Sequence, residues 1–304
     1  MPKITRRGFL AGAIATGTAA FAAPQTLFAG AVPKVTKGTD LVTLGKSGLK
    51  PTLLGIGTGT RGGSEQLAIG QAEFTKMVRH ALDRGIRYID TADRYQTHLF
   101  VRLALKGVPR ERYFIQTKTP ARHPEVAKAD INRFRRELGV DTIDSLLMHC
   151  MTKESWPTDM RPVMDELLKA KERGHVKAVG ISCHGFAPLA AAVGCDWCDI
   201  QLARINPFGV QMDGEPDKVS AELKKMHAKG RGVIGMKVFG ETGYDGPGKR
   251  LQALRYVLGL GCVDCFTIGF VSAKQIDETL GLIETAGQAS VGWLRAPQVG
   301  EAAA

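Results

Sequence analysis

The sequence predicts a (β/α)₈ barrel of the α/β class, and three observations support that fold class. From about Thr52 onward, short β-rich runs alternate with amphipathic segments of helical length, which is typical of parallel strands joined by crossover helices. Eight such pairs can be counted. No long linker rich in Pro, Gly and Ser separates them, so eight units in one domain favour a closed barrel over an open doubly wound sheet.

The expected barrel domain covers residues 41–290, and its elements follow one another along the chain. The strands are expected near Leu53–Thr58, Arg87–Asp90, Tyr113–Lys118, Thr142–His149, Val176–Ser182, Cys198–Ala203, Gly232–Lys237 and Val263–Gly269. The helices are expected near Gln71–Arg84, Gln96–Lys106, Pro124–Leu138, Met160–Arg173, Phe186–Val193, Pro216–Lys229, Lys249–Leu258 and Ser272–Thr285.

A segment ahead of the first barrel strand has the pattern of a β-hairpin. Residues Leu41–Pro51 place apolar runs on either side of a turn that contains glycine. We expect this N-terminal hairpin to close the lower end of the barrel, opposite the carboxyl ends of the strands, where barrel active sites lie.

The composition is that of an ordinary globular protein with a basic balance. The 304 residues are 44% hydrophobic and 23% charged, and the formal net charge is +11. A positive excess suits anionic ligands, although a basic surface without a specific partner explains it equally well. We expect no nucleic-acid binding, because the only dense basic cluster is Arg133, Arg135 and Arg136 on an expected helix.

The first 31 residues read as a cleavable twin-arginine signal peptide. Arg6 and Arg7 stand directly before a weakly apolar run, Phe9–Ala23, that is shorter than the roughly 20 residues needed to cross a bilayer. The small-residue rule allows cleavage after Ala22 or Ala31, and an uncleaved extension is the alternative. The expectation is export through the Tat machinery to the periplasm.

Six cysteines include two C-x-x-C pairs, Cys195/Cys198 and Cys262/Cys265. Two such pairs can ligate zinc, and either can form a disulfide in an oxidising compartment. Cys198 and Cys265 lie in short apolar runs expected to be strands, so buried structural thiols are the favoured interpretation and no metal is expected.

Polar residues at the expected strand ends form a coherent chemical set. Asp90 ends the second strand, Tyr95 lies just beyond it, Lys118 ends the third strand and His149 ends the fourth. Neighbouring strands lie about 4.8 Å apart, so these groups can converge in one cavity. Each residue alone has a structural explanation, such as a helix cap for Asp90 or a satisfied core histidine for His149, but four on one rim favour a site.

The same four residues suit the reduction of a carbonyl group, which needs a hydride donor and a proton for the developing alkoxide. A phenol has a pKa of about 10 and needs tuning to act as an acid at neutral pH. Lys118 beside Tyr95 is expected to lower the pKa of the phenol, and Asp90 is expected to keep the buried ammonium charged. His149 is then placed to orient the carbonyl.

The segment Tyr88–Tyr95 resembles the Asp-Thr-Ala segment of the aldo-keto reductases, with a tyrosine five residues after the aspartate. The segments around Lys118 and His149 resemble the lysine and histidine segments of that family, and the similarity runs from about Leu41 to Ile283. It implies an NAD(P)H-dependent reductase of aldehydes or ketones in which Tyr95 is the general acid/base, Lys118 and Asp90 tune it, and His149 positions the carbonyl.

The resemblance also implies a coenzyme site. The first strand-loop (Gly57, Thr58), Ser182 and Gln201 match family positions around the nicotinamide. Met236 stands where an aromatic residue is common and Cys183 where asparagine is usual, while Lys237, Gly240 and Gly243 suit a pyrophosphate loop. The full set of expected coenzyme contacts is Gly57, Thr58, Asp90, Ser182, Gln201, Met236, Lys237, Phe239, Gly240, Gly269, Gln275 and Glu278.

The choice between the two coenzymes depends on the last strand-helix junction. In the family an arginine there often holds the ribose phosphate, but Gln275 occupies that position here, and a neutral amide forms no bidentate ion pair with phosphate. Lys274 is a partial substitute, so NADP(H) is favoured slightly over NAD(H).

Two alternatives of other classes remain open. One is a non-catalytic nucleotide-binding or redox-sensing barrel, which the intact four-residue set disfavours. The other is a metal or electron-transfer protein, which would need the four C-x-x-C sulfurs to converge. The sequence predicts neither the carbonyl substrate nor the oligomeric state.

Overall fold

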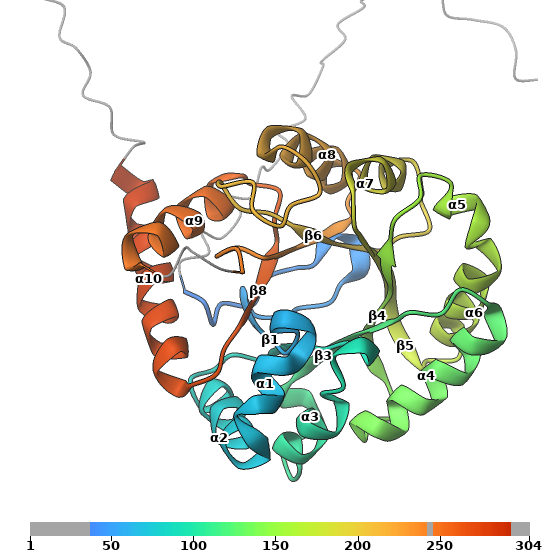
Figure 1. Ribbon diagram of the computed structural model, residues 1–304, viewed down its shortest axis with the longest axis horizontal. Coiled ribbons are helices and arrows are strands. Elements are labelled where there is room, and N and C mark those ends of the chain that lie inside the picture. Colours follow the sequence, from blue (N-terminus) through green and yellow to red (C-terminus); the bar gives the residue numbers. More distant parts are fainter. Residues whose placement is uncertain (1–36, 242–245, 293–304) are drawn as a thin grey trace, which may run out of the picture. The chain divides into compact units, whose positions relative to one another are not determined.

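The computed structural model describes residues 37–241 and 246–292, so the expected leader and Gly243 lie outside the described residues. Eight parallel strands close into a barrel in chain order, each hydrogen-bonded to the next and β8 to β1 (Figure 1). Their bounds are β1 Leu54–Gly57, β2 Tyr88–Asp90, β3 Phe114–Thr119, β4 Ile143–Met151, β5 Val176–Cys183, β6 Ile200–Arg204, β7 Gly232–Met236 and β8 Cys265–Gly269. The predicted fold class is confirmed.

Helices surround this barrel on the outside (Figure 1). Their bounds are α1 Ser64–Ala68, α2 Gly70–Asp83, α3 His98–Leu105, α4 Pro124–Leu138, α5 Trp156–Asp159, α6 Arg161–Glu172, α7 Phe186–Val193, α8 Pro216–Ala228, α9 Pro247–Gly259 and α10 Ala273–Gly292. Short 3₁₀ turns are η1 Gly45–Ser47, η2 Thr60–Gly63, η3 Asp93–Tyr95 and η4 Arg110–Arg112.

Helix α4 shows how local sequence sets these elements. Pro124 occupies the first turn, where its missing N–H costs nothing. Gly139 ends the helix in the left-handed conformation at φ 69°, and its N–H returns to the carbonyls of Arg135 and Arg136. The buried side chains recur every three or four residues, so one face packs on the barrel: Ala127, Asp130, Ile131, Phe134 and Leu138.

The strands differ from the helices in being buried on both faces. Every residue of β1, β2 and β3 is buried, because one face looks into the barrel and the other meets the helices. The barrel interior is therefore a packed core below the active-site rim. This explains why apolar residues stand on both faces of most strands, whereas β3 also buries Gln116, Thr117, Lys118 and Thr119.

The expected elements agree with the structure to within a few residues at each end, except that α10 continues to Gly292 where the sequence predicted an end near Thr285. Helices Pro124–Leu138 and Phe186–Val193 have the expected bounds, whereas β6 begins at Ile200 rather than at Cys198. The sequence analysis missed α1, α5 and η3, since one-turn helices carry no measurable periodicity. The last of these matters most, because η3 carries Tyr95.

The segment before β1 is hairpin-like but is not a two-stranded ribbon. Val42 N–H donates to the Pro51 carbonyl at 3.0 Å and Leu44 N–H to the Leu49 carbonyl at 2.9 Å, around the turn η1. Lys46 N–H donates to the Gly230 carbonyl at 2.7 Å, just before β7 begins. The segment thus covers the amino-terminal end of the barrel, opposite the active-site rim, as predicted.

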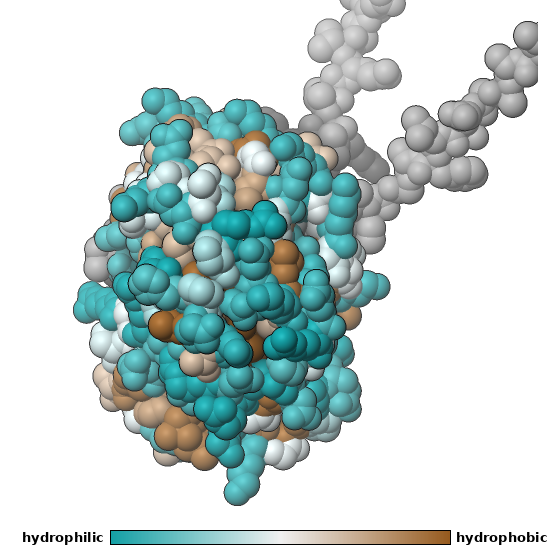
Figure 2. All heavy atoms as spheres, turned by 90° about the vertical axis from the view of Figure 1, so that its right-hand side faces the viewer, coloured by the Kyte–Doolittle hydropathy of each residue, from teal (hydrophilic) through white to brown (hydrophobic). Residues whose placement is uncertain are grey.

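The hydrophilic character of the outer surface follows from the amphipathic helices that cover the barrel. Figure 2 shows the side of the barrel that lies on the right in Figure 1, where hydrophilic residues dominate and apolar residues are scattered among them. Within residues 37–241 and 246–292, no helix combines the length and the apolar character that a membrane span requires.

Candidate active site

The four predicted catalytic residues meet at the carboxyl ends of neighbouring strands. A cavity of about 480 Å³ opens there, and Asp90, Tyr95 and His149 line it. Lys118 lies in β3 and is completely buried. Parallel register places β2, β3 and β4 side by side, so the groups converge because their strands end at the same rim.

A buried ion pair forms the base of this site. Lys118 Nζ lies 2.7 and 2.9 Å from the two carboxylate oxygens of Asp90 and donates to the Thr91 carbonyl at 2.9 Å. Gln116 donates a further hydrogen bond to Asp90 Oδ1 at 2.8 Å. Burial alone would lower the pKa of Lys118, but Asp90 and Tyr95 outweigh it and raise that pKa, so the ammonium stays charged.

Tyr95 is positioned by the turn η3 and by a close backbone contact. Its ring centroid lies 4.8 Å from Lys118 Nζ and 5.6 Å from the His149 ring, which it meets edge to face. A Cβ atom at Gly59 would lie 2.3 Å from the tyrosine ring, so only glycine fits behind the phenol. The phenol is therefore held between the backbone of Gly59 and the side chains of Lys118 and His149.

The electrostatics of Tyr95 differ from the sequence-based expectation. Lys118 does lower the pKa of the phenol, as predicted, but burial is the larger effect and the net pKa is raised above its ordinary value. The expected net lowering is wrong for the protein alone. A protonated phenol at neutral pH is a proton donor, which is the form that a reduction consumes.

His149 is held as a neutral imidazole. Burial, followed by the charge of Lys118, lowers its pKa to about 2. Its Nδ1 is buried and has no hydrogen-bond partner among the residues that the structure describes. The strand register shifts between Met148 and Met151, and Cys150 takes a positive φ of 58° there, so His149 and Cys150 both face the cavity. A neutral imidazole can donate to a carbonyl oxygen.

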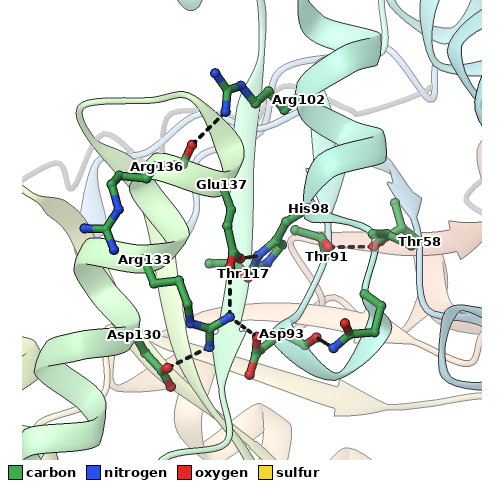
Figure 3. Close-up of polar contacts among 12 residues, drawn as sticks. Thr58, Thr91, Asp93, His98, Arg102, Thr117, Asp130, Arg133, Arg136 and Glu137 are labelled. Carbon is green, nitrogen blue, oxygen red and sulfur yellow. Dashed lines mark hydrogen bonds and ion pairs between the residues drawn. The ribbon is translucent and has the colours of Figure 1, made fainter.

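Behind the cavity, a buried polar network connects β1, β2 and β3 to helix α3 (Figure 3). The Thr97 hydroxyl lies 2.8 Å from the Thr58 hydroxyl and 2.9 Å from that of Thr91. His98, the next residue, contacts the Thr117 hydroxyl at 2.8 Å, directly beside Lys118. These contacts fix the strand ends that carry Asp90 and Lys118.

Arg133 of α4 extends this network to the turn that carries Tyr95 (Figure 3). Its guanidinium donates to Asp93 at 2.7 Å, Asp130 at 2.7 Å and Glu137 at 3.1 Å. Asp93 begins η3, so α4 anchors the turn through a charge-assisted contact. Asp93, His98 and Glu137 are close enough to be metal ligands, but the Arg133 guanidinium already binds both carboxylates.

Most of the expected coenzyme contacts surround the same cavity. Eight of them line it: Gly57, Asp90, Met236, Lys237, Phe239, Gly240, Gly269 and Gln275. Thr58, Ser182 and Gln201 are buried behind the wall, where Ser182 Oγ accepts a hydrogen bond from Cys150 N–H at 3.0 Å. Glu278 is half-exposed, 3.9 Å from Arg250 and 3.8 Å from Lys274.

Several cavity residues were missed by the sequence analysis. Arg94, Cys150, His184 and Arg204 line the cavity on the side of Tyr95 and His149. Arg94 neighbours Tyr95 in the chain, and His184 Nε2 lies 3.3 Å from Cys150 Sγ. A polar residue at the end of a strand or directly after it was the available signal: Arg204 is the last residue of β6, and His184 directly follows β5. Taken alone, however, that criterion also fits many loop residues that line no cavity.

The two C-x-x-C pairs lie away from this cavity. Cys198, Cys262 and Cys265 are buried, as the sequence predicted for structural thiols. Among residues 37–241 and 246–292, no group of three or more potential metal ligands contains a cysteine. The four sulfurs therefore do not converge into a metal-binding set.

A match to a protein-family model identifies the family that these site features indicate. The model of the aldo/keto reductase family matches residues 53–252. The chain belongs to this family. Its curated relatives include an aldo-keto reductase of Mycolicibacterium paratuberculosis, 30% identical over 169 residues, and the glycerol 2-dehydrogenase (NADP(+)) of Saccharomyces cerevisiae, 40% identical over 92 residues. These matches cover 53% and 29% of this chain.

Two solved structures of similar shape agree with that assignment at the level of the fold. A Pseudomonas aeruginosa protein assigned to the aldo-keto reductases superposes with a TM-score of 0.71 at 19% identity, covering 83% of this chain and 97% of that one. An aldo-keto reductase of Bacillus halodurans in its holo form gives 0.64 at 18%, covering 82% and 95%. The chain spans about half the length of the curated Mycolicibacterium relative, 54%, and 27% of the yeast enzyme.

The contacts of Arg133 with three carboxylates predict a measurable contribution to stability. Replacing Arg133 with Gln leaves three carboxylates without their shared cation, so we expect the free energy of unfolding to fall by about 1–2 kcal/mol. Urea denaturation measures it. Arg161→Gln is the matched control, since that arginine makes one exposed pair with Asp165 and its loss costs roughly 0–0.5 kcal/mol. Equal losses in both variants would show that the network adds nothing.

Proposed function

We propose that this aldo/keto reductase transfers a hydride between NAD(P)H and the carbonyl of a small aldehyde or ketone, with Tyr95 as general acid/base. One observation carries the proposal. Tyr95 and His149 line a single cavity directly above the buried Lys118–Asp90 pair. Those groups can supply a proton and orient a carbonyl, which are the two tasks that hydride transfer leaves to the protein.

The cavity wall fits a nicotinamide coenzyme. Gly57, Gly240 and Gly269 line it with backbone alone, and a Cβ at Gly269 would lie 1.9 Å from Thr60 Oγ1. Lys237 supplies positive charge beside these glycines, suited to a pyrophosphate. The bound coenzyme would supply the hydride.

The remaining chemistry belongs to side chains of the chain itself. His149, neutral because of its lowered pKa, donates an N–H to the substrate carbonyl and fixes its orientation. The Tyr95 hydroxyl gives its proton to the oxygen on which negative charge develops. The charged Lys118 stabilises the resulting phenolate, and Asp90 keeps Lys118 in place. The raised pKa of Tyr95 favours reduction at neutral pH and alcohol oxidation at alkaline pH.

The first test of this function is the substitution Tyr95→Phe. It removes the proton donor and keeps the ring, so we expect carbonyl reduction to fall by about 10²–10⁴-fold while coenzyme affinity stays within a factor of about two. Oxidation of NAD(P)H across aldehydes and ketones, with coenzyme titration by fluorescence, measures both. Tyr113→Phe is a control, because Tyr113 precedes β3 outside the cavity. Near-normal turnover in Tyr95→Phe would remove Tyr95 from the mechanism.

NADP(H) is the coenzyme that we propose, although the supporting charges are modest. Lys274 and Arg250 both lie near Glu278 at the rim of the cavity, where a ribose phosphate would bind. Gln275 Oε1 accepts a hydrogen bond from Val271 N–H at 2.9 Å, so this side chain supports the loop rather than offering charge. The yeast glycerol dehydrogenase named above is an NADP(+) enzyme.

Introducing a guanidinium at this position tests the coenzyme assignment. We expect Gln275→Arg to strengthen NADPH binding relative to NADH by about tenfold, because a bidentate ion pair to phosphate becomes available. Dissociation constants of both coenzymes give the ratio. Gln275→Ala controls for the lost loop hydrogen bond. If the ratio in Gln275→Arg equals that in Gln275→Ala, residue 275 does not face the ribose phosphate.

On the substrate side, the charges favour a carbonyl compound that also carries an anionic group. The carboxylates lining the cavity are paired: Glu65 with Arg61, Asp90 with Lys118 and Glu241 with Lys237. Arg94 lines the cavity and forms no hydrogen bond or ion pair with any other residue in the described ranges. Its exposed guanidinium beside Tyr95 is therefore available to a carboxylate or phosphate of the substrate.

A pair of aldehydes that differ in charge tests this preference. For 4-carboxybenzaldehyde we expect Arg94→Gln to raise KM by about 5–30-fold, since a charge-assisted contact contributes about 1–2 kcal/mol. The KM for 4-methylbenzaldehyde is expected to stay unchanged. Arg161→Gln, on the far helix α6, is expected to affect neither substrate. A similar rise for both aldehydes would show that Arg94 supports the structure rather than recognising charge.

We propose, from the sequence pattern alone, that residues 1–31 direct export of the folded protein with its nucleotide enclosed. A ligand that binds only the native state adds stability, so loading before export is favoured thermodynamically. Replacing Arg6 and Arg7 with Lys is expected to leave unprocessed protein in the cytoplasm, as cell fractionation would show. Acid extraction of gently isolated periplasmic protein is expected to release a nicotinamide nucleotide, and an exported protein without nucleotide would contradict the loading step.

A further inference from the structure

The function proposed above uses none of the C-x-x-C cysteines, yet one pair has an unusual setting. Cys195 and Cys198 form a turn between α7 and β6, in which Cys198 N–H donates to the Cys195 carbonyl at 3.4 Å. The turn brings the first and fourth residues together. Cys195 is partly exposed, whereas Cys198 is buried, so Cys195 is the more accessible residue of the pair.

The turn is anchored by a buried cation. Arg231 is 5% exposed and donates to the Cys195 carbonyl at 2.6 Å and to the Ala192 carbonyl at 2.6 Å. In the described part of the chain its side chain makes no ion pair with a carboxylate, so a positive charge remains beside the two sulfurs. Trp197 fixes the other side of the turn through a hydrogen bond to the Met164 carbonyl at 3.2 Å.

This setting gives the thiols of Cys195 and Cys198 different pKa values. The neighbouring Cys198 thiol, followed by the Trp197 backbone and the charge of Arg231, outweighs burial and lowers the pKa of Cys195 to about 6. Burial raises the pKa of Cys198 well above its ordinary value. At neutral pH Cys195 is therefore mainly a thiolate, and Cys198 keeps its proton.

The second pair provides an internal comparison with identical spacing. Cys262 and Cys265 are both buried, at 2% and 0% exposure, and burial raises the pKa of both thiols. A buried protonated thiol neither meets a disulfide in solution nor attacks it. Cys150 is half-exposed, but burial raises its pKa too.

We propose that Cys195 and Cys198 form a redox-active dithiol site that exchanges with low-molecular-weight disulfides. The Cys195 thiolate attacks one sulfur of the small disulfide, breaks its S–S bond and releases one thiolate, which leaves a mixed disulfide on Cys195. Cys198 then loses its proton to water and attacks the Cys195 sulfur, and the second small thiolate leaves. Two electrons pass from the protein dithiol to the small disulfide, which is reduced to two thiols.

The site is separate from the proposed carbonyl chemistry. Cys198 precedes β6, at the amino-terminal end of the barrel, while the cavity lies at the carboxyl ends of the strands. No step of the exchange uses the coenzyme or Tyr95. The exchange can therefore be detected whether or not the protein reduces carbonyls.

The test uses the purified chain, oxidised glutathione and peptide mass spectrometry after alkylation. We expect the Cys195–Cys198 peptide to lose two hydrogen atoms, and alkylation of Cys195 by iodoacetamide to reach half its maximal rate near pH 6. Cys198→Ser should trap a glutathione adduct on Cys195, and Cys195→Ser should yield neither product. The double substitution Cys262→Ser with Cys265→Ser should leave the reaction unchanged.

Other outcomes overturn the proposal. A Cys195 that stays reduced in the native protein, or that is alkylated no faster than Cys150 at pH 7, rules out an activated thiolate. A disulfide that forms equally in the Cys262–Cys265 peptide shows that the setting of Cys195 confers no selectivity. Circular dichroism of each variant confirms that the barrel is folded, so that a missing product reports on chemistry rather than on unfolding.

Discussion

The ion pair between Lys118 and Asp90 is the constraint on which the active-site end of this barrel depends. Both side chains are buried, and a buried charge left without its partner costs roughly 3–5 kcal/mol. The pair forms because Asp90, the last residue of β2, lies level with Gln116 of β3, two residues before Lys118, and Gln116 and the Thr91 carbonyl complete its hydrogen bonds. The positive charge of Lys118 contributes a lowering effect to the pKa of both Tyr95 and His149. The proposed proton donor and the proposed carbonyl-orienting residue therefore depend on the same charge.

The closed barrel and the membership of its active-site rim could be predicted from the sequence because both follow from short-range rules. Eight alternations of apolar runs and amphipathic segments specify the layers, and the carboxyl ends of parallel strands then meet at one edge. Asp90, Lys118 and His149 could be picked out because they are titratable residues at the ends of three successive expected strands. Helix α4 was predicted with its observed bounds because Pro124 and Gly139 mark its two ends.

What the sequence did not reveal depends on contacts between distant segments. Asp93 and Arg133 are forty residues apart, and neither position shows which partner it will meet. The turn η3 is one turn long and follows from that contact rather than from periodicity. The net pKa direction of Tyr95 required knowing that burial exceeds the effect of Lys118, a comparison of magnitudes that a residue pattern does not contain. The bulge that turns both His149 and Cys150 to the cavity depends on how β4 pairs with β5.

The close packing of Gly59 against Tyr95 also bears on how Tyr95, the proposed proton donor, could change in descendants of this sequence. No side chain fits at position 59 while the phenol stands in front of it, since even a methyl group would overlap the ring. A larger residue at position 59 becomes acceptable only after the tyrosine has moved or has been replaced by something smaller. Substitutions at these two positions can therefore accumulate in only one order. Tyr95 must change before a larger residue is accepted at position 59, and that larger residue then leaves no room for a tyrosine at position 95.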